Sequence, residues 1–344
     1  IKFELKIIYN DTRCRVMNII KNTLLVIIIC LVILFLVLIG IKPVVIEAYL
    51  DTDVTNENVS VIDLGVITKT NSSDVRIANN NVYINAGGVY EVEGILYNGT
   101  IYIDTKEDVT LNFKGVTLVN EVNSVIDNRK SDKVVVNLEE DSNNILSDGS
   151  SSAAAIKSVG DLFLEGDGSM LIYGNHGSGI AVNGGNFVIN GIKLYVVAKE
   201  EAFDVTEEFL INAGVVLGLG NGKMQPTSEL SKQNTLLFNF NSLFLEGTTF
   251  SLYSLEDASI INFMAVRDFK TLTLSTPDLD KGKYRMYQSI DCDAKVKNGV
   301  YNDCDVKLGD EVNIGITDTF IVDKKWNWYG SMDIIFNYAP EITI

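Results

Sequence analysis

The chain has 344 residues, of which 47% are hydrophobic and only four are proline, so it is long enough to bury a large core and is not a disordered chain. Its formal net charge of −17 argues against nucleic acid as a partner, because an acidic surface repels phosphates. Residues 1–43 carry a net charge of +4, so the remainder carries −21.

The first predicted element is a transmembrane helix over residues 24–41, LLVIIICLVILFLVLIGI. These 18 residues contain no charge and would extend ~27 Å as a helix, close to the thickness of a bilayer core. Arg13, Arg15 and Lys21 precede the segment, which predicts that residues 1–23 are cytoplasmic and that the rest is extracellular. A cleaved signal peptide is the alternative, but its apolar core is usually shorter and ends at a small-x-small site.

Residues 42–73 are rich in Asp, Asn, Thr and Val and predict a polar spacer with an edge strand. Residues 74–223 then repeat in rows. AAIKSVGDLFLEGDGSMLIYGNHG is followed by SGIAVNGGNFVINGIKLYVVAKEE and by AFDVTEEFLINAGVVLGLGNGK. One row cannot bury its own apolar side, whereas stacked rows cover one another. The short alternating strands and the fixed period predict a parallel β-helix, with an antiparallel β-sandwich as the alternative.

The repeat also predicts which side chains stack in the core. Ile101, Val125, Ile156, Ile180 and Phe203 occupy equivalent positions in successive rows and should form one inward-facing column. The step from Val125 to Ile156 is longer than the others, which predicts an inserted loop near DSNNILSDGSSS.

Residues 224–344 have longer strands with hairpin-like spacing and predict an antiparallel β-rich cap on the C-terminal end of the β-helix, where open edges need cover. Cys292 and Cys304 are 12 residues apart, which suits a disulfide in an oxidising compartment better than a zinc site. Trp326 and Trp328 would share one face of a strand, either within a core or interface or as a surface on which sugar rings stack.

Several stretches resemble a known family in their order: NNNVYINAGGVYEVEG, DVTLNFKGVTL, AAIKSVGDLFLEGDGSMLIYGN, GVVLGLGNGKMQPTSELSKQNTLLFNF, GTTFSLYS, LTLSTPDLDKGKYRMY and VKNGVYNDCDVKLG. From about Val75 to about Val322 the chain is similar to the bacterial cellulose- and pectin-binding β-helix family of carbohydrate-binding domain-containing proteins. The resemblance implies a right-handed, pectate-lyase-like parallel β-helix that is extracellular, binds plant-type polysaccharides and carries calcium on its flank. It implies no catalysis.

The chain departs from that family where successive coils begin. The family tends to carry Asn-Asp-Gly-Ile and Asp-Asp-Gly-Ile there, whereas this chain has Gly-Ser-Gly-Ile at 177–180 and Glu-Glu-Ala-Phe at 200–203. Calcium prefers six to eight oxygen ligands, including carboxylates. Glu200, Glu201 and Asp204 are therefore the candidate calcium ligands, and Ser178 removes one anionic ligand. Solvated turn residues are the alternative interpretation of the three carboxylates.

The same corner is the predicted carbohydrate site. A surface of charge −21 repels a polyuronide unless a cation bridges the two, so a pectin-like glycan is expected to bind through calcium held by Glu200, Glu201 and Asp204. Ser178, Asn175 and His176 would be neighbouring hydrogen-bonding groups in the binding surface. His176, in the turn GNHG, is alternatively a plain surface histidine.

Catalysis is not predicted. A lyase needs a basic side chain beside calcium, and Arg129 with Lys130 at a coil turn is the candidate, although such pairs are usually only solvated. A single histidine does not support a Ser-His-Asp triad. The sequence thus predicts a membrane-anchored, extracellular, non-catalytic binder of pectin-like or cellulose-like polysaccharide. A cell-surface adhesin without sugar binding is the second hypothesis, and a polysaccharide lyase is the third.

Overall fold

The computed structural model describes residues 60–65, 68–151, 153–254, 259–288, 296–297, 300–301, 320–322 and 324–330, and all regular structure in them is β-strand. Among these residues no helix is long and apolar enough to cross a membrane. The predicted transmembrane segment 24–41 and the predicted disulfide between Cys292 and Cys304 lie outside the described residues.

The strands form three sheets. The first sheet contains β1 (Ser60–Leu64), β2 (Lys69–Thr70), β5 (Gly88–Tyr97), β7 (Val109–Val119), β9 (Lys133–Leu138), β10 (Asn143–Ser147), β12 (Asp161–Gly166), β13 (Ser169–Gly174), β15 (Phe187–Ala198), β17 (Phe209–Gly220), β18 (Thr235–Phe244), β21 (Phe269–Ser275) and β26 (Trp326–Gly330). The second sheet contains β3 (Val75–Ala78), β4 (Asn81–Ile84), β6 (Ile101–Ile103), β8 (Ile126–Asn128), β11 (Ala154–Ser158), β14 (Ser178–Val182) and β16 (Phe203–Val205). The cap sheet contains β19 (Thr249–Ser254), β20 (Ser259–Met264), β22 (Gly282–Gln288), β23 (Val296–Lys297), β24 (Val300–Tyr301) and β25 (Phe320–Val322).

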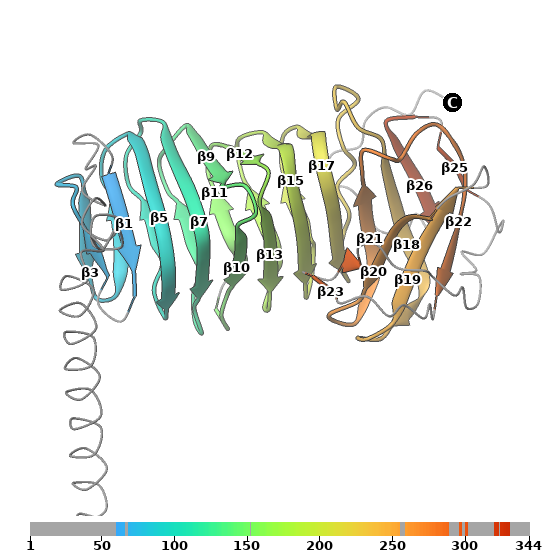
Figure 1. The fold of residues 1–344 in the computed structure, drawn as a ribbon, viewed down its shortest axis with the longest axis horizontal. Coiled ribbons are helices and arrows are strands. Elements are labelled where there is room, and N and C mark those ends of the chain that lie inside the picture. The colour runs from blue at the N-terminus through green and yellow to red at the C-terminus, as the bar shows by residue number, and fades with distance from the viewer. Residues whose placement is uncertain are drawn as a thin grey trace, which may run out of the picture. The chain divides into compact units, whose positions relative to one another are not determined.

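The first and second sheets are the two walls of a parallel β-solenoid of about five turns, which confirms the predicted parallel β-helix (Figure 1). Each turn contributes one short strand to the second sheet and one long strand, or two shorter ones, to the first. Strands of successive turns pair in parallel, as β4 does with β6 and β15 with β17. At the N-terminal end, β2 and β3 instead pair antiparallel with β1 and β4.

The inward column of the second sheet follows the predicted repeat with one correction. Ile101, Ile126, Ile156, Ile180 and Phe203 are register partners in consecutive strands and are at most 3% exposed. Val125, which we predicted for this column, lies one position earlier. It is also fully buried, because the chain already turns inward where each short strand begins, so spacing alone did not distinguish the two neighbours.

The predicted inserted loop near DSNNILSDGSSS is also wrong, because part of that stretch is a strand. Residues 143–147 of that stretch form β10, which pairs in parallel with β7 and β13. The additional residues of this turn are spread over the connections at 129–132, 139–142 and 148–153. Strand pairing fixes the register of each wall, whereas the corners between walls tolerate different lengths, so the extra length accumulates in several corners.

Apolar side chains fill the space between the two walls. Toward the C-terminal end the filling becomes aromatic, with the rings of Phe187, Phe203 and Phe209 in mutual contact at centroid distances of 5.0 to 5.9 Å. Burial of one such side chain stabilises the fold by ~1.5–3 kcal/mol. This apolar core is therefore the main source of solenoid stability. The inward column within it sets the position of every outward side chain on the same strands.

An antiparallel cap follows the last turn, as predicted. Strand β21 pairs antiparallel with β17 and with β18, although the last described strand, β26, pairs in parallel with β18. The cap also covers the outer face of β13, β15 and β17, where Leu171, Tyr195 and Leu217 join its apolar cluster. The Tyr195 hydroxyl donates to the Met264 carbonyl at 2.6 Å, and burial raises the pKa of Tyr195.

Candidate binding site on the outer face of the second sheet

One side chain per strand points outward from the second sheet, and these side chains form a continuous column. Register pairs Arg76 with Tyr83, Tyr83 with Tyr102, Tyr102 with Asp127, and Asp127 with Lys157. The column continues through Ala181 to Asp204. Neighbouring strands in a sheet lie ~4.8 Å apart, so residues far apart in the sequence touch here. We call this set the outer column.

At the N-terminal end of the outer column, two stacked tyrosine rings are each contacted by one guanidinium group. The rings of Tyr83 and Tyr102 stack with their centroids 5.1 Å apart. The Arg76 guanidinium lies 3.8 Å from the centroid of Tyr83, and the Arg129 guanidinium lies 3.6 Å from that of Tyr102. Cation–π attraction of this kind orients a cationic side chain without neutralising it. Arg129 is thereby fixed over the sheet rather than extended into solvent.

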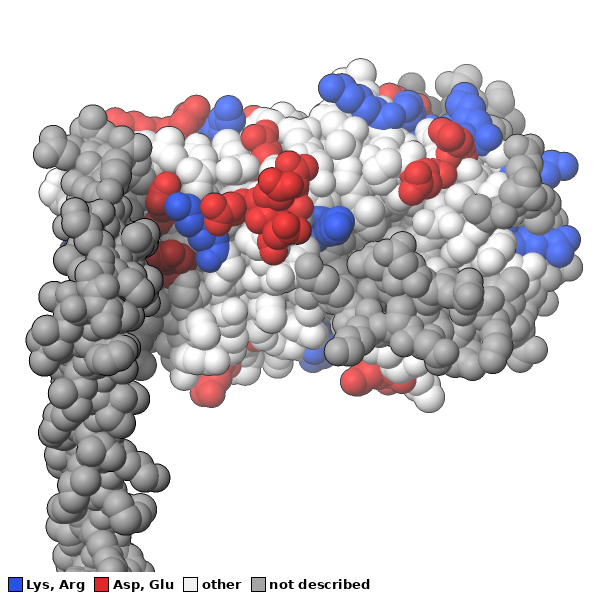
Figure 2. Space-filling view, viewed as in Figure 1, with Lys and Arg blue, Asp and Glu red and all other residues white. Residues whose placement is uncertain are grey.

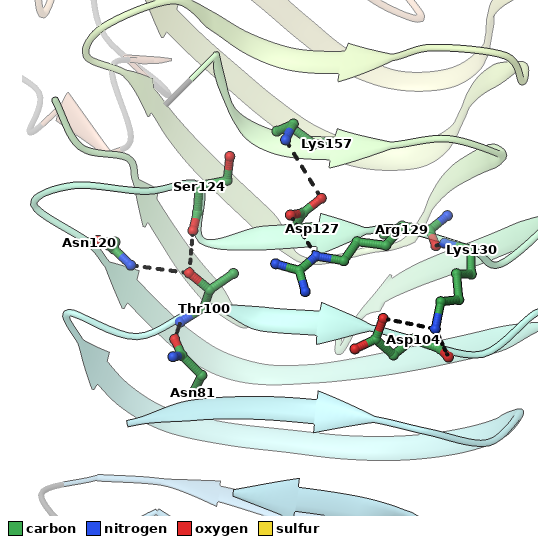
Figure 3. Close-up of polar contacts among 10 residues, drawn as sticks. Asn81, Thr100, Asp104, Asn120, Ser124, Asp127, Arg129, Lys130 and Lys157 are labelled. Carbon is green, nitrogen blue, oxygen red and sulfur yellow. Dashed lines mark hydrogen bonds and ion pairs between the residues drawn. The ribbon is translucent and has the colours of Figure 1, made fainter. Parts of the chain in front are cut away.

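A hollow of 210 Å³ opens beside Arg129, and we call it the cationic pocket. Tyr102, Asp127, Arg129 and Lys157 line it. The corners before the strands complete the lining with four polar residues and one alanine: Thr100, Asn123, Ser124, Ser151 and Ala153. The Asp127 carboxylate accepts a hydrogen bond from Arg129 Nε at 3.1 Å and lies 3.8 Å from Lys157 Nζ (Figure 3). Two cations share one carboxylate, so these three groups have a net positive charge.

The Arg129 guanidinium keeps donors for a ligand. Only its Nε contacts Asp127, and among the described residues its two terminal nitrogens have no hydrogen-bond partner. In Figure 3 the side chain extends back along the sheet from the end of β8, which directs these nitrogens toward the Thr100 side of the pocket. Terminal guanidinium nitrogens bind carboxylates with two parallel hydrogen bonds.

Hydrogen bonds hold the corner wall of the pocket. The Thr100 hydroxyl donates to the Ser124 carbonyl at 2.7 Å and accepts from Asn120 Nδ2 at 3.2 Å, while the Thr100 amide donates to Asn81 Oδ1 at 2.9 Å. These bonds link three successive corners (Figure 3). At the far side Lys130 pairs with Asp104 at 3.4 Å. The wall is therefore preformed before any ligand arrives.

The pocket differs from the general surface of this acidic chain. On the face shown in Figure 2, the largest group of Asp and Glu side chains lies over the middle of the solenoid, next to a broad area without charged side chains. A positive hollow in a chain of net charge −17 attracts anions locally, because opposite charges interact most strongly at short range.

The predicted site residues lie farther along the same sheet, in what we call the acidic corner: Ser178, Glu200, Glu201 and Asp204. The two coil starts stack as expected, since Ser178 Oγ donates to Glu201 Oε2 at 3.2 Å and the Gly179 amide donates to the Glu201 carbonyl at 2.9 Å. Burial raises the pKa of Asp204, nearby Glu201 raises it further, and Lys223 partly opposes both.

The acidic corner does not gather a preformed set of calcium ligands. Among the described residues, no group of three or more His, Cys, Asp or Glu side chains is arranged to hold a metal ion. Glu201 already accepts hydrogen bonds from Ser178 and from the Lys223 amide at 3.2 Å each. A calcium ion here would need further oxygen ligands from outside this group of side chains.

The two other predicted contact residues have different environments. The Asn175 side chain donates to the Ser147 hydroxyl and the Asp148 carbonyl, and accepts from Arg267 Nη2 of the cap at 2.6 Å. Arg267 Nη1 donates to the Gly174 carbonyl at 2.9 Å. Asn175 thus joins the cap to the solenoid, whereas His176 is exposed in the turn that follows.

Sequence reasoning identified Arg129 but not its neighbours Tyr102, Asp127 and Lys157. The four residues come from three successive turns, and no local motif contains them. The available signal was the middle position of each short strand, because that position faces outward when its neighbours face inward. Correct alignment of the rows at Ile126 would have placed Tyr102, Asp127 and Lys157 in one line.

Comparisons with known proteins find a matching family and a similar solved structure. A model of a family described as carbohydrate-binding domain-containing protein matches residues 78–262. A solved structure, the gadolinium derivative of a polysaccharide lyase-like protein from C. thermocellum, is similar with 19% identity and a TM-score of 0.38, over 48% of this chain and 90% of that one. No curated protein matches this chain.

Proposed function

This chain belongs to the family of carbohydrate-binding domain-containing proteins, and from that premise we propose that it is a non-catalytic binder of an acidic polysaccharide. The ligand lies along the outer column of the second sheet, with the cationic pocket as its anchor. The observation that carries the proposal is the pair Arg129 and Lys157 around one carboxylate in a chain that is otherwise strongly acidic.

The chemistry of the pocket favours a uronate over a neutral glucan. A carboxylate on the sugar can accept two hydrogen bonds from the terminal nitrogens of Arg129 and attract Lys157, while the hydroxyl-lined wall meets the ring hydroxyls. A neutral glucan would need an open aromatic face. The facing surfaces of Tyr83 and Tyr102 cover each other, and Arg76 and Arg129 lie against their rings. We therefore favour a pectin-like over a cellulose-like glycan.

We propose calcium as an auxiliary at the acidic corner. Asp204 belongs to the same outer column as the pocket, so a glycan that follows the column reaches it. Glu200, Glu201 and Asp204 supply carboxylates there, and the glycan's own carboxylates would complete the coordination. Cellular placement, with residues 24–41 as a membrane anchor and the solenoid outside the cell, is part of the same proposal and rests on the sequence alone.

Binding of oligogalacturonate, measured by calorimetry with and without chelator, tests the proposal. Arg129→Gln and Lys157→Gln should each weaken binding by about 10–100-fold, and the double variant by about 100–10,000-fold, because each substitution removes a charge-assisted hydrogen bond worth ~1.5–3 kcal/mol. Lys193→Gln, an exposed lysine on β15, is the matched control and should change affinity less than about twofold.

Three outcomes would contradict this function. If the double variant and the parent bind oligogalacturonate with equal affinity, the cationic pocket is not part of the binding site. If the chain binds no acidic or neutral glycan, the adhesin hypothesis is favoured. Unsaturated products absorbing in the ultraviolet would instead identify a lyase.

A further inference from the structure

A second hollow, of 340 Å³, lies at the C-terminal end of the solenoid. Its walls are the turn between β16 and β17, the segment 225–230 that enters the cap, and Trp326 of β26. It is separate from the cationic pocket, whose lining residues all precede Ser158. Its volume falls within the range of small-ligand sites. We call it the terminal pocket.

The terminal pocket combines an apolar surface with uncompensated carboxylates. Phe209 is buried beneath it, Trp326 is partly exposed in its lining, and Leu230 is 74% exposed. Glu207, Glu208 and Glu229 are exposed around it. No Lys or Arg lines the pocket, and none of the three carboxylates forms an ion pair among the described residues.

Backbone hydrogen bonds hold this pocket in shape. The Ser228 amide donates to the Phe209 carbonyl at 2.6 Å, which fastens the entering segment to the last turn of the solenoid. The Glu208 amide donates to Asn186 Oδ1 at 3.3 Å, and the Leu230 amide donates to Ser228 Oγ at 3.1 Å. Both sides of the hollow are therefore positioned without a ligand, which lowers the ordering cost of binding.

We infer that the terminal pocket binds a protonated primary amine carried on a glycan, such as a glucosamine unit. An ammonium group in the hollow would contact the indole of Trp326 and lie close to the three carboxylates. A uronate would be repelled by the same carboxylates. The choice of a glycan as the carrier of the ammonium rests on the proposed function, whereas the choice of charge rests on the pocket itself.

Tryptophan fluorescence gives a direct assay, because Trp326 is one of only two tryptophans in the chain. The full chain is titrated at pH 6 with a glucosamine oligomer, whose amines are then protonated, and with the N-acetylated oligomer of equal length, which has no such charge. The glucosamine oligomer should change the fluorescence, and added salt should weaken its binding. The N-acetylated oligomer should bind at least about tenfold more weakly.

Two sets of variants test the assignment. Glu207→Gln with Glu208→Gln should lower the affinity for the glucosamine oligomer about tenfold, while Glu139→Gln with Glu140→Gln, two exposed glutamates after β9, should leave it within about twofold. Trp326→Leu, followed by calorimetry, should lower it by about 2–30-fold. Because the charge variants keep the volume of each side chain, they test the site even where Trp326→Leu disturbs the cap.

The outcomes separate this inference from the proposed function. Equal binding of the two oligomers would overturn the assignment of an ammonium group as the ligand. Binding of spermidine but not of the glucosamine oligomer would overturn the inference that a glycan carries this ammonium group. Oligogalacturonate is titrated into the same preparation. If it binds while the glucosamine oligomer does not, the terminal pocket is wrongly assigned and the cationic pocket stands. If only the glucosamine oligomer binds, the proposed function fails and the terminal pocket stands.

Discussion

The cationic pocket and the acidic corner lie on one face of one sheet, yet they have opposite chemistry. Both are built on the outer column, with Lys157 and Asp204 separated by a single residue, Ala181. In the pocket, two cations share the carboxylate of Asp127, whereas at the corner burial and then the neighbouring Glu201 raise the pKa of Asp204. Because successive turns stack in parallel, a different residue at the same position of each turn changes the surface charge from one turn to the next along the solenoid axis.

This difference teaches that local composition is a poor guide to where charged side chains gather on the folded chain. The acidic corner is visible in the sequence because Glu200, Glu201 and Asp204 are close neighbours there. The cationic pocket is spread over 58 residues, from Thr100 to Lys157, and is surrounded by acidic sequence. The following experiments separate the contributions of the two regions, beginning with the core that supports both.

The largest effect is expected for Ile180→Asp. Ile180 is fully buried between Ile156 and Phe203, on the inner side of the sheet whose outer face carries both regions. An unpaired carboxylate there should cost several kcal/mol, about 3–5, and glycan binding at both regions should disappear with the fold. Urea unfolding followed by circular dichroism measures the loss. Lys193→Asp adds the same group on the outside and should have little effect; a parent-like midpoint for Ile180→Asp would mean that the register is wrong.

A smaller effect is expected for Tyr102→Leu, which removes the ring beneath the Arg129 guanidinium but no charge. Loss of a cation–π contact worth ~0.5–1 kcal/mol should weaken oligogalacturonate binding by about 2–5-fold. Tyr83→Leu is the matched control, because it removes a neighbouring ring of the same stack but leaves the one that contacts Arg129. Equal losses in the two variants would show that the stack as a whole matters, and not the orientation of Arg129.

Ser178→Asp tests the contribution of the acidic corner, as Tyr102→Leu tests that of the cationic pocket. It adds a carboxylate beside Glu201 and should strengthen calcium-dependent binding of oligogalacturonate by a few-fold, roughly 2–5-fold. Chelator should remove that gain and should reduce, but not abolish, binding by the parent chain, because the cationic pocket needs no metal. Complete loss of parental binding in chelator would make the acidic corner the principal site.

The smallest effect concerns the pH dependence of stability at Asp204. Its pKa is raised on folding, so the folded chain holds that proton more tightly than the unfolded chain, and stability falls as pH rises from about 3.8 through the folded pKa. Asp204→Asn should therefore be slightly more stable than the parent at pH 7, by less than ~1 kcal/mol because the group is half-buried. Below pH ~3.5 the advantage should vanish, as thermal melting across pH would reveal. Asp167→Asn, at an exposed position, should show no such trend.

The repeat pattern was sufficient to predict the solenoid and much of its core. Ile156, Ile180 and Phe203 recur 24 and 23 residues apart because each turn must place an apolar side chain beneath the next one. The antiparallel cap was predicted for a similar reason, since the open end of the solenoid needs cover. The register at Val125 could not be predicted, because two adjacent buried residues satisfy the same spacing.

The binding face was decided by tertiary structure. The sequence alone determined that the chain is acidic, that its rows stack in parallel and that Glu200, Glu201 and Asp204 are close together. Only the three-dimensional stacking placed Tyr102, Asp127, Arg129 and Lys157 in one hollow, and Trp326 beside Glu207 and Glu208 in another. The physical reason is that strand pairing brings residues about one row apart in the sequence to within ~4.8 Å of each other. The cap likewise brings Trp326 next to Glu207, although the two are nearly 120 residues apart in the sequence. Neither distance is encoded in the identity of any single residue.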